Sequence, residues 1–149
     1  MTSTLHVKHW VATSPEEVWR AYTTPELFHQ FFSPDGLRIP LESVVMELEV
    51  GGRFEFDMVF EASGEVSPNR GVIVALEPPN RMVFLEPDFM GGELRSTQQF
   101  TANGAGTLIS VAQEGLPEEI VGNPEVLEAF RSCYRKLGRV LGVAAENRD

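Results

Sequence analysis

The segment from Asn123 to Ala144 constrains the fold of this chain more than any other segment. Its apolar residues recur with the 3.6-residue period of an α-helix and fall within a stripe roughly 120° wide. The stripe consists of Val126, Phe130, Cys133, Tyr134, Leu137, Val140, Leu141 and Ala144. Polar residues, including Ser132 and Arg135, fill the opposite side. A helix of about twenty residues is roughly 30 Å long, so we expect it to lie across a whole sheet with Phe130 and Tyr134 facing inward.

Residues that cap helices precede proline at three places in the chain. Asn123 precedes Pro124 at the start of the long helix. Ser14-Pro15-Glu16-Glu17 combines a cap, a proline suited to the first turn and a glutamate that can reach back to the Ser14 amide. Thr24-Pro25-Glu26 repeats the cap and the proline. The sequence therefore predicts two short helices after a first strand near residues 4–12.

Between the short helices and the long one, apolar residues alternate with polar ones, which is the period of a β-strand. Residues 44–50 and 54–60 predict two strands joined at Gly51-Gly52. Both apolar sets reach one face only if the turn has three residues or a glycine bulge, because a one-residue slip reverses every side chain. We expect the bulge, followed by a loop over residues 61–70.

Further strands are expected at short spacing, joined by turns rich in glycine and proline. They cover residues 71–76, 82–85, 93–101 and 107–113. The turns are Pro78-Pro79-Asn80, Met90-Gly91-Gly92 and Asn103-Gly104-Ala105-Gly106. The chain is therefore predicted to be of the α+β class, with an antiparallel sheet of about six or seven strands and a long C-terminal helix.

Six short motifs, taken in order, carry a resemblance to a known family. They are Ser14-Pro15-Glu16-Glu17-Val18-Trp19, Tyr22-Thr23-Thr24-Pro25-Glu26, Gly51-Gly52-Arg53-Phe54, Gly71-Val72-Ile73, Pro79-Asn80-Arg81-Met82-Val83-Phe84 and Gly106-Thr107-Leu108-Ile109. The series, from about Leu5 to Leu141, resembles the small bacterial single-domain form of the family named after the activator of the heat-shock-protein-ninety ATPase. Members often have a tryptophan where this chain has Phe31-Phe32 before Ser33-Pro34.

The resemblance implies the helix-grip fold of the START-like superfamily, with residues 1–149 forming a single domain. In that fold a curved sheet wraps around the long helix, and two short helices close a cavity between them. Superfamily relatives bind lipids, sterols, polyketides or other apolar molecules there, and some are cyclases or aromatases.

Composition excludes several classes of partner. The net charge of −10 disfavours binding to nucleic acid and to anionic membrane surfaces. No apolar run approaches the roughly 18 residues of a membrane span, and no signal peptide is evident. We therefore expect a cytoplasmic protein without membrane insertion. The single cysteine, Cys133, cannot form an internal disulfide.

The aromatic residues and methionines supply the candidate binding site. We expect Phe32, Phe54, Phe56, Met58, Phe84, Phe130 and Tyr134 to line the wall, with the Tyr134 hydroxyl offering one polar contact. The alternative is that these side chains fill a solid core. A concave sheet lined by phenylalanine and methionine favours a preformed apolar pocket.

Metal, cofactor and nucleophile chemistry find little support. His6 and His9 lie three apart on a predicted strand and so point to opposite faces. Cys133 sits within the apolar stripe of the long helix, where cysteine usually behaves as a small hydrophobe. The glycine pairs lack the lysine and serine or threonine of a phosphate-binding loop. We predict no metal, no cofactor and no catalytic residue.

Acid–base chemistry needs an inward-pointing ionisable group on a strand. The candidates are Glu86, Asp88, Arg95, Gln98, Gln99, Gln113 and Glu114. A buried carboxylate among them would suit a general acid or base, but we expect these residues on the solvated face or at strand ends.

These observations lead to one main functional hypothesis and two alternatives. The main hypothesis is a non-enzymatic domain that binds a small apolar or amphipathic molecule between the sheet and the long helix. The alternatives are a polyketide-cyclase or aromatase-like enzyme and a co-chaperone-like module that binds another protein. An edge strand or the Arg131–Arg139 face could also support a homodimer.

Overall fold

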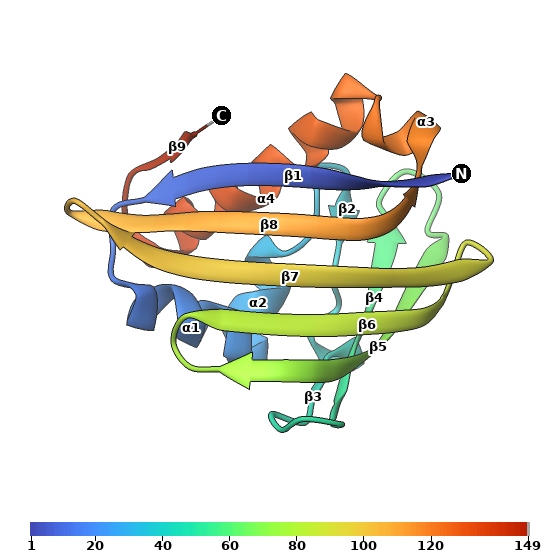
Figure 1. Ribbon diagram of the computed structural model, residues 1–149, viewed down its shortest axis with the longest axis horizontal. Coiled ribbons are helices and arrows are strands. Elements are labelled where there is room, and N and C mark those ends of the chain that lie inside the picture. Colours follow the sequence, from blue (N-terminus) through green and yellow to red (C-terminus); the bar gives the residue numbers. More distant parts are fainter. Residues whose placement is uncertain (149) are drawn as a thin grey trace.

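The computed structural model describes residues 1–148 and consists of one antiparallel sheet with helices on one of its faces (Figure 1). The strand order is β2-β4-β5-β6-β7-β8-β1-β9, and β3 pairs with β4. Six strands are long: β1 (Thr2–Val11), β4 (Arg53–Phe60), β5 (Val66–Glu77), β6 (Arg81–Phe89), β7 (Gly92–Asn103) and β8 (Gly106–Pro117). Three are short: β2 (Leu37–Arg38), β3 (Val45–Met46) and β9 (Ala145–Asn147). The sheet therefore has nine strands rather than the predicted six or seven, and the extra ones are two or three residues long.

The helices are α1 (Pro15–Thr23), α2 (Pro25–Phe31), α3 (Glu118–Val121) and α4 (Pro124–Leu141), with a 3-10 turn η1 at Leu41–Ser43. The predicted starts of α1 and α4 are confirmed, because Ser14 Oγ accepts from the Glu17 amide at 3.3 Å and Asn123 Oδ1 accepts from the Glu125 amide at 2.9 Å. The capping box at Ser14 forms only in part, since the Glu17 carboxylate pairs with Arg20 instead. Thr24 makes no side-chain cap.

Helix α4 lies across the face of the sheet that also carries α1 and α2, here called the inner face (Figure 1). Tyr134 and Leu137 are fully buried against it. The predicted stripe needs two corrections. Ser132, expected on the polar side, is buried because its Oγ accepts from the Asp35 amide at 3.1 Å. Ala144 lies beyond the end of the helix, because Gly142 with φ 69° turns the chain toward β9.

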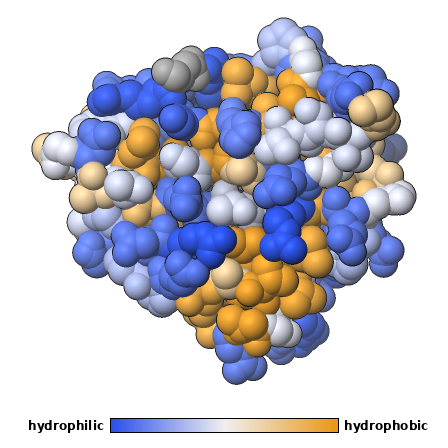
Figure 2. All heavy atoms as spheres, viewed as in Figure 1, coloured by the Kyte–Doolittle hydropathy of each residue, from blue (hydrophilic) through white to orange (hydrophobic). Residues whose placement is uncertain are grey.

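The predicted hairpin at Gly51-Gly52 is wrong. β3 ends at Met46, which pairs with Phe54, and residues 47–52 form a loop between β3 and β4. Gly52 packs so tightly in this loop that an added Cβ would lie 2.0 Å from the Glu47 carbonyl oxygen. Leu48 and Val50, expected on the buried face of a strand, are 46% and 67% exposed. Figure 2 shows apolar side chains gathered at the lower end of the molecule, over this loop and β5.

The expected loop at 61–70 is also shorter than predicted. β5 already begins at Val66, and Ser67 pairs with Met58 of β4. The turns at Pro78-Pro79-Asn80, Met90-Gly91-Gly92 and Asn103–Gly106 are confirmed, since strands end and begin on either side of each.

Candidate functional site

A cavity of about 480 Å³ lies between the inner face of the sheet and α4. Its wall is mostly apolar, and all seven residues predicted for the binding site line it, namely Phe32, Phe54, Phe56, Met58, Phe84, Phe130 and Tyr134. The rest of its apolar lining comes from Pro34, Phe89, Leu94, Leu116, Ile120, Val126, Ala129 and Cys133. The sheet, α2 and α4 thus each contribute to one hollow.

The aromatic wall is held in place by rings behind it. Phe54 stacks on Phe84 with ring centroids 4.8 Å apart. Phe28, fully buried in α2, stacks on Phe32 at 4.6 Å and meets Phe54 and Phe56 edge-on, each at 5.3 Å. Such aromatic pairs contribute about 0.5–1.5 kcal/mol each beyond the area they bury. Phe28 was not among the predicted site residues, although its spacing to Phe31 and Phe32 on the short helix was the available signal.

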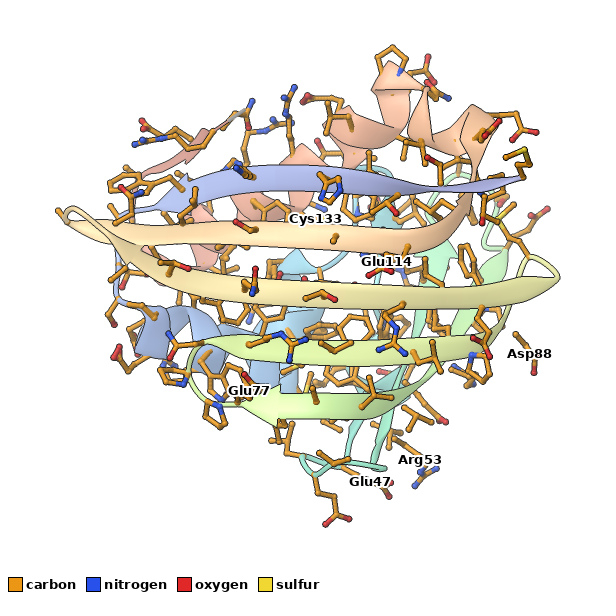
Figure 3. The ribbon with its side chains drawn as sticks, viewed as in Figure 1. Glu47, Arg53, Glu77, Asp88, Glu114 and Cys133 are labelled. Carbon is orange, nitrogen blue, oxygen red and sulfur yellow. The ribbon has the colours of Figure 1, made fainter. Side chains whose placement is uncertain are left out.

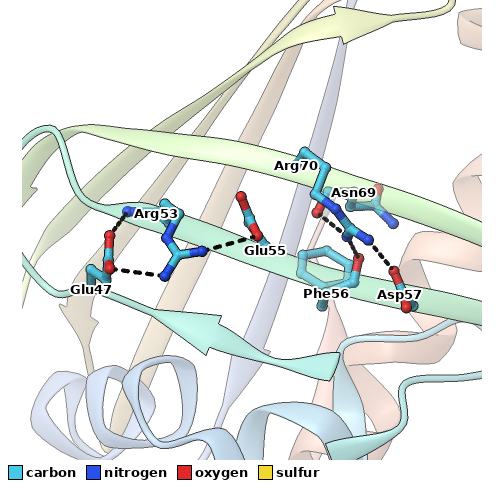
Figure 4. Close-up of polar contacts among 7 residues, drawn as sticks. All are labelled: Glu47, Arg53, Glu55, Phe56, Asp57, Asn69 and Arg70. Atoms are coloured by element: carbon cyan, nitrogen blue, oxygen red, sulfur yellow. Dashed lines mark hydrogen bonds and ion pairs between the residues drawn. The ribbon is translucent and has the colours of Figure 1, made fainter. Parts of the chain in front are cut away.

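The opposite surface of β4 fixes the wall from outside (Figure 4). Arg53 pairs with Glu47 at 3.2 Å, which ties the loop before β4 to that strand. Arg70 of β5 pairs with Asp57 at 2.9 Å and donates to the Phe56 carbonyl at 3.3 Å. Exposed pairs of this kind are individually weak, but they join β4 to its neighbours on the side away from the cavity.

A buried chain of polar groups runs across the inner face behind the cavity. The Tyr22 hydroxyl donates to Gln98 Oε1 at 3.2 Å and lies 3.5 Å from the Tyr134 hydroxyl. The amide nitrogens of Gln98 and Gln113 both donate to Ser96 Oγ. The Tyr134 hydroxyl therefore already has a partner within the protein. The network joins α1, α4 and two central strands, so it fixes the position of the helix over the sheet.

The candidates for acid–base chemistry divide between the two faces. Asp88, Arg95, Gln99 and Glu114 are exposed, as expected, and Figure 3 shows Asp88 at the outer end of the β6–β7 hairpin. For Gln98, Gln113 and Glu86 the expectation is wrong, because all three are buried on the inner face. Gln98 is two residues from the buried Phe100, so strand alternation places both side chains on the same face.

Glu86 is the ionisable side chain with the most unusual setting in the cavity wall. It is only 9% exposed and follows Phe84 along the inner face of β6. No hydrogen bond or ion pair joins its carboxyl group to another described residue, and burial raises its pKa to about 7. Gly71 lies beside it, and a Cβ added there would lie 3.6 Å from Glu86 Cγ and 3.0 Å from the Phe54 carbonyl oxygen. The tight contact is the one with the β4 backbone, whereas the distance to Glu86 is an ordinary van der Waals contact.

Two further groups, His9 of β1 and Cys133 of α4, are held neutral by burial. His9 is fully buried against Tyr134, with ring centroids 5.4 Å apart, and burial lowers its pKa to about 4. Burial likewise raises the pKa of the Cys133 thiol to about 12. At neutral pH Cys133 is therefore a thiol rather than the thiolate that a nucleophile requires.

Residues 1–148 contain neither a membrane-spanning helix nor a cluster of metal ligands. No helix there is both long and apolar enough to span a membrane. No group of three or more histidine, cysteine, aspartate or glutamate side chains is arranged to hold a metal ion in that range.

A large curved antiparallel sheet closed over a long C-terminal helix defines the helix-grip class of the START-like superfamily. The family model described as "Activator of Hsp90 ATPase homolog 1-like protein" matches residues 12–142. The chain therefore belongs to this family, and the predicted resemblance is confirmed. No curated protein matches the sequence closely enough to count as a relative.

Solved structures of bacterial proteins share the fold. A Chromobacterium violaceum protein is 21% identical with a TM-score of 0.81, covering 93% of this chain and 96% of its own. A Nitrosomonas europaea protein is 19% identical with a TM-score of 0.82, covering 93% and 94%. The AHSA1 protein of Silicibacter pomeroyi is 20% identical with a TM-score of 0.74, covering 94% and 98%.

Proposed function

We propose that the protein is a single START-like domain that binds a small apolar or amphipathic molecule between the sheet and α4. Phe32, Phe54, Phe56, Met58, Phe84, Phe130 and Tyr134 form the contact wall of this site. The observation that carries the proposal is a preformed hollow of about 480 Å³ with a largely apolar lining, within the roughly 300–1,000 Å³ range of small-molecule pockets.

The size of the cavity argues against a sealed packing defect. At about 24 cal/mol per Å³ of void, a sealed empty space of 480 Å³ would cost roughly 12 kcal/mol. That cost is comparable with the whole stability of a domain, which is about 5–15 kcal/mol. A cavity of this size is therefore one that solvent or a ligand occupies.

A thermal-shift screen against lipids, sterols and aromatic polyketides tests the proposal. A ligand at a hundred times its Kd stabilises the folded state by about 2.7 kcal/mol, which raises the Tm of a domain this long by roughly 5–10 °C. Absence of any shift at concentrations well above micromolar would contradict the proposal.

Filling the cavity supplies the matched test. Ala129 lines the cavity on α4, so Ala129→Phe places a ring in the ligand's space and should abolish the shift produced by any ligand found. Ala62 is exposed in the turn after β4, so Ala62→Phe is the control and should keep the shift. If both variants kept the full thermal shift, the ligand would bind outside the cavity.

Glu86 favours a second candidate, an acid–base enzyme acting on a polyketide-like substrate, because such an enzyme needs a buried ionisable group in the cavity wall. General acid–base catalysis contributes about 10²–10⁴-fold, so Glu86→Gln should reduce turnover by that factor. If the wild type bound such substrates but converted none of them, the enzyme candidate would be wrong and the binding function would stand.

The family description gives the third candidate, a co-chaperone-like module. This candidate predicts that the protein stimulates the ATPase of a heat-shock chaperone of the Hsp90 type. An Ala129→Phe variant that kept full stimulation would separate that activity from the cavity.

A further inference from the structure

Three polar side chains of the cavity wall, Gln113, Asn69 and Glu86, present oxygen acceptors. Gln113 donates its Nε2 to Ser96 at 2.7 Å, and Asn69 donates its Nδ2 to the Ser67 carbonyl at 3.1 Å. Among the described residues, no hydrogen bond reaches the side-chain oxygen of either amide. Glu86 is 9% exposed as a residue, and no hydrogen bond or ion pair joins its carboxyl group to another residue within 1–148. At a pH above the pKa of Glu86, a ligand therefore meets three groups that need a hydrogen-bond donor.

The charges around the cavity have one sign. Among the residues that the structure describes, the charged side chains of the lining are Glu86 and Glu125, and no lysine, arginine or histidine lines it. Arg70 is exposed and paired with Asp57 on the other side of the sheet. Arg95 is exposed opposite Leu85, also away from the cavity. The whole chain carries −10, which attracts cations over about a Debye length.

One feature of the rim works the other way, because the positive end of the α4 dipole attracts anions. That end is already occupied: Asn123 Oδ1 accepts from the Glu125 amide at 2.9 Å, and the Glu125 carboxylate lies in the first turn. The rim therefore offers little to a carboxylate or phosphate.

We infer that the cavity selects a cationic amphiphile, whose ammonium group pairs with the Glu86 carboxylate while its apolar tail lies against Phe54 and Phe84. This inference rests on the proposed function and names the chemistry of its ligand. Asn69 is the diagonal neighbour of Glu86 on β5, so its oxygen is placed to accept a second hydrogen bond from the same ammonium. Fatty acids, which share the tail but carry the opposite charge, are repelled by the same carboxylate when it is ionised.

Three probes with one tail and different heads test the inference: decylamine, decan-1-ol and decanoate, each titrated by calorimetry at pH 8 in low salt. Hydrogen bonds to charged groups are worth about 1.5–3 kcal/mol, so decylamine should bind roughly 10- to 100-fold more tightly than decanol. Decanoate should bind more weakly than decanol. Glu86→Gln should reduce decylamine affinity to that of decanol and leave decanol affinity unchanged.

The pH dependence provides an independent readout. Decylamine affinity should fall as Glu86 takes up a proton between pH 8 and pH 5, while decanol affinity should not fall. The other ionisable groups of the lining are Glu125, Cys133 and Tyr134. Burial raises the pKa of Cys133 to about 12 and that of Tyr134 above its usual range, so both stay neutral in this window. Glu125 is exposed at the rim, and Glu125→Gln should keep the pH dependence.

The control variant removes the same charge outside the cavity. Asp88 is exposed at the hairpin two residues after Glu86, and Asp88→Asn should retain the preference for decylamine. Decanoate or decanol binding as tightly as decylamine would overturn the inference and leave the proposed function standing. Loss of the preference for decylamine in Asp88→Asn would also overturn the inference. Absence of binding heat from all three probes would contradict both the inference and the proposed function.

Discussion

Replacing Glu86 with glutamine tests the description of the cavity wall through stability alone. Burial raises the pKa of this carboxyl group from 4.5 to about 7, so the folded protein holds its proton more tightly than the unfolded chain. The wild type therefore loses stability as the pH rises from about 4.5 to above 7, and a tenfold change in proton affinity is worth about 1.4 kcal/mol. Integrated over that interval, the loss is roughly 3 kcal/mol.

Glutamine has the shape of the protonated acid and does not ionise, so Glu86→Gln avoids this loss. We expect the variant to exceed the wild type by roughly 2–3 kcal/mol at pH 8.5 and to equal it near pH 4.5. Urea unfolding followed by tryptophan fluorescence at both pH values measures the two differences. A difference that does not change with pH, or a variant less stable at pH 8.5, would refute the reasoning. Asp88→Asn should differ little from the wild type at either pH.

Two more predictions concern the packing around the cavity. Burial lowers the pKa of His9 to about 4, so the folded state loses stability as the pH falls from about 6.5 to 4. The free energy of unfolding of His9→Phe, measured relative to that of the wild type, should therefore rise by roughly 2–3 kcal/mol from pH 7.5 to pH 4. A difference that stays constant over this pH range in the same urea assay would contradict this prediction. A Cβ added to Gly106 would lie 2.2 Å from the Val11 carbonyl oxygen, so Gly106→Ala should cost about 2 kcal/mol or more and lower the Tm. At Gly92 the nearest atom would be 3.9 Å away, and Gly92→Ala is the control; equal losses from both would show that the close approach at Gly106 is not the cause.

The parts of the fold that were predictable are those in which one residue type has one local role. Ser14 and Asn123 are caps before proline, and the side-chain hydrogen bonds from both confirm the starts of α1 and α4. Tyr134 and Leu137 of the apolar stripe lie buried on the sheet. The seven aromatic and methionine residues chosen as a wall line one cavity, while their contact with a ligand stays a proposal.

Other features depended on contacts distant in sequence. Gly51-Gly52 is a common hairpin pair, but Gly52 is needed for its approach to the Glu47 carbonyl in a longer loop. Ser132 has the spacing of a polar helix surface, yet the Asp35 amide reaches it from the segment after α2. Gln98 and Gln113 are buried with their amide nitrogens bonded to Ser96 Oγ, and Glu86 is buried in the cavity wall. Polarity alone placed these side chains outside, whereas strand alternation places Gln98 on the face of Phe100 and Glu86 on the face of Phe84.

The most direct test of a ligand site between the sheet and α4 is an NMR titration of the methionine methyl groups with decylamine. Met58 lines the cavity, whereas Met90 is 67% exposed at the β6–β7 hairpin and Met46 lies outside the lining on β3. We predict a saturable shift of the Met58 methyl signal, with much smaller changes at Met90 and Met46, and its loss in Ala129→Phe. Shifts confined to Met90, or shared by all three signals without saturation, would mean that the amphiphile coats the surface and that the cavity is not its site.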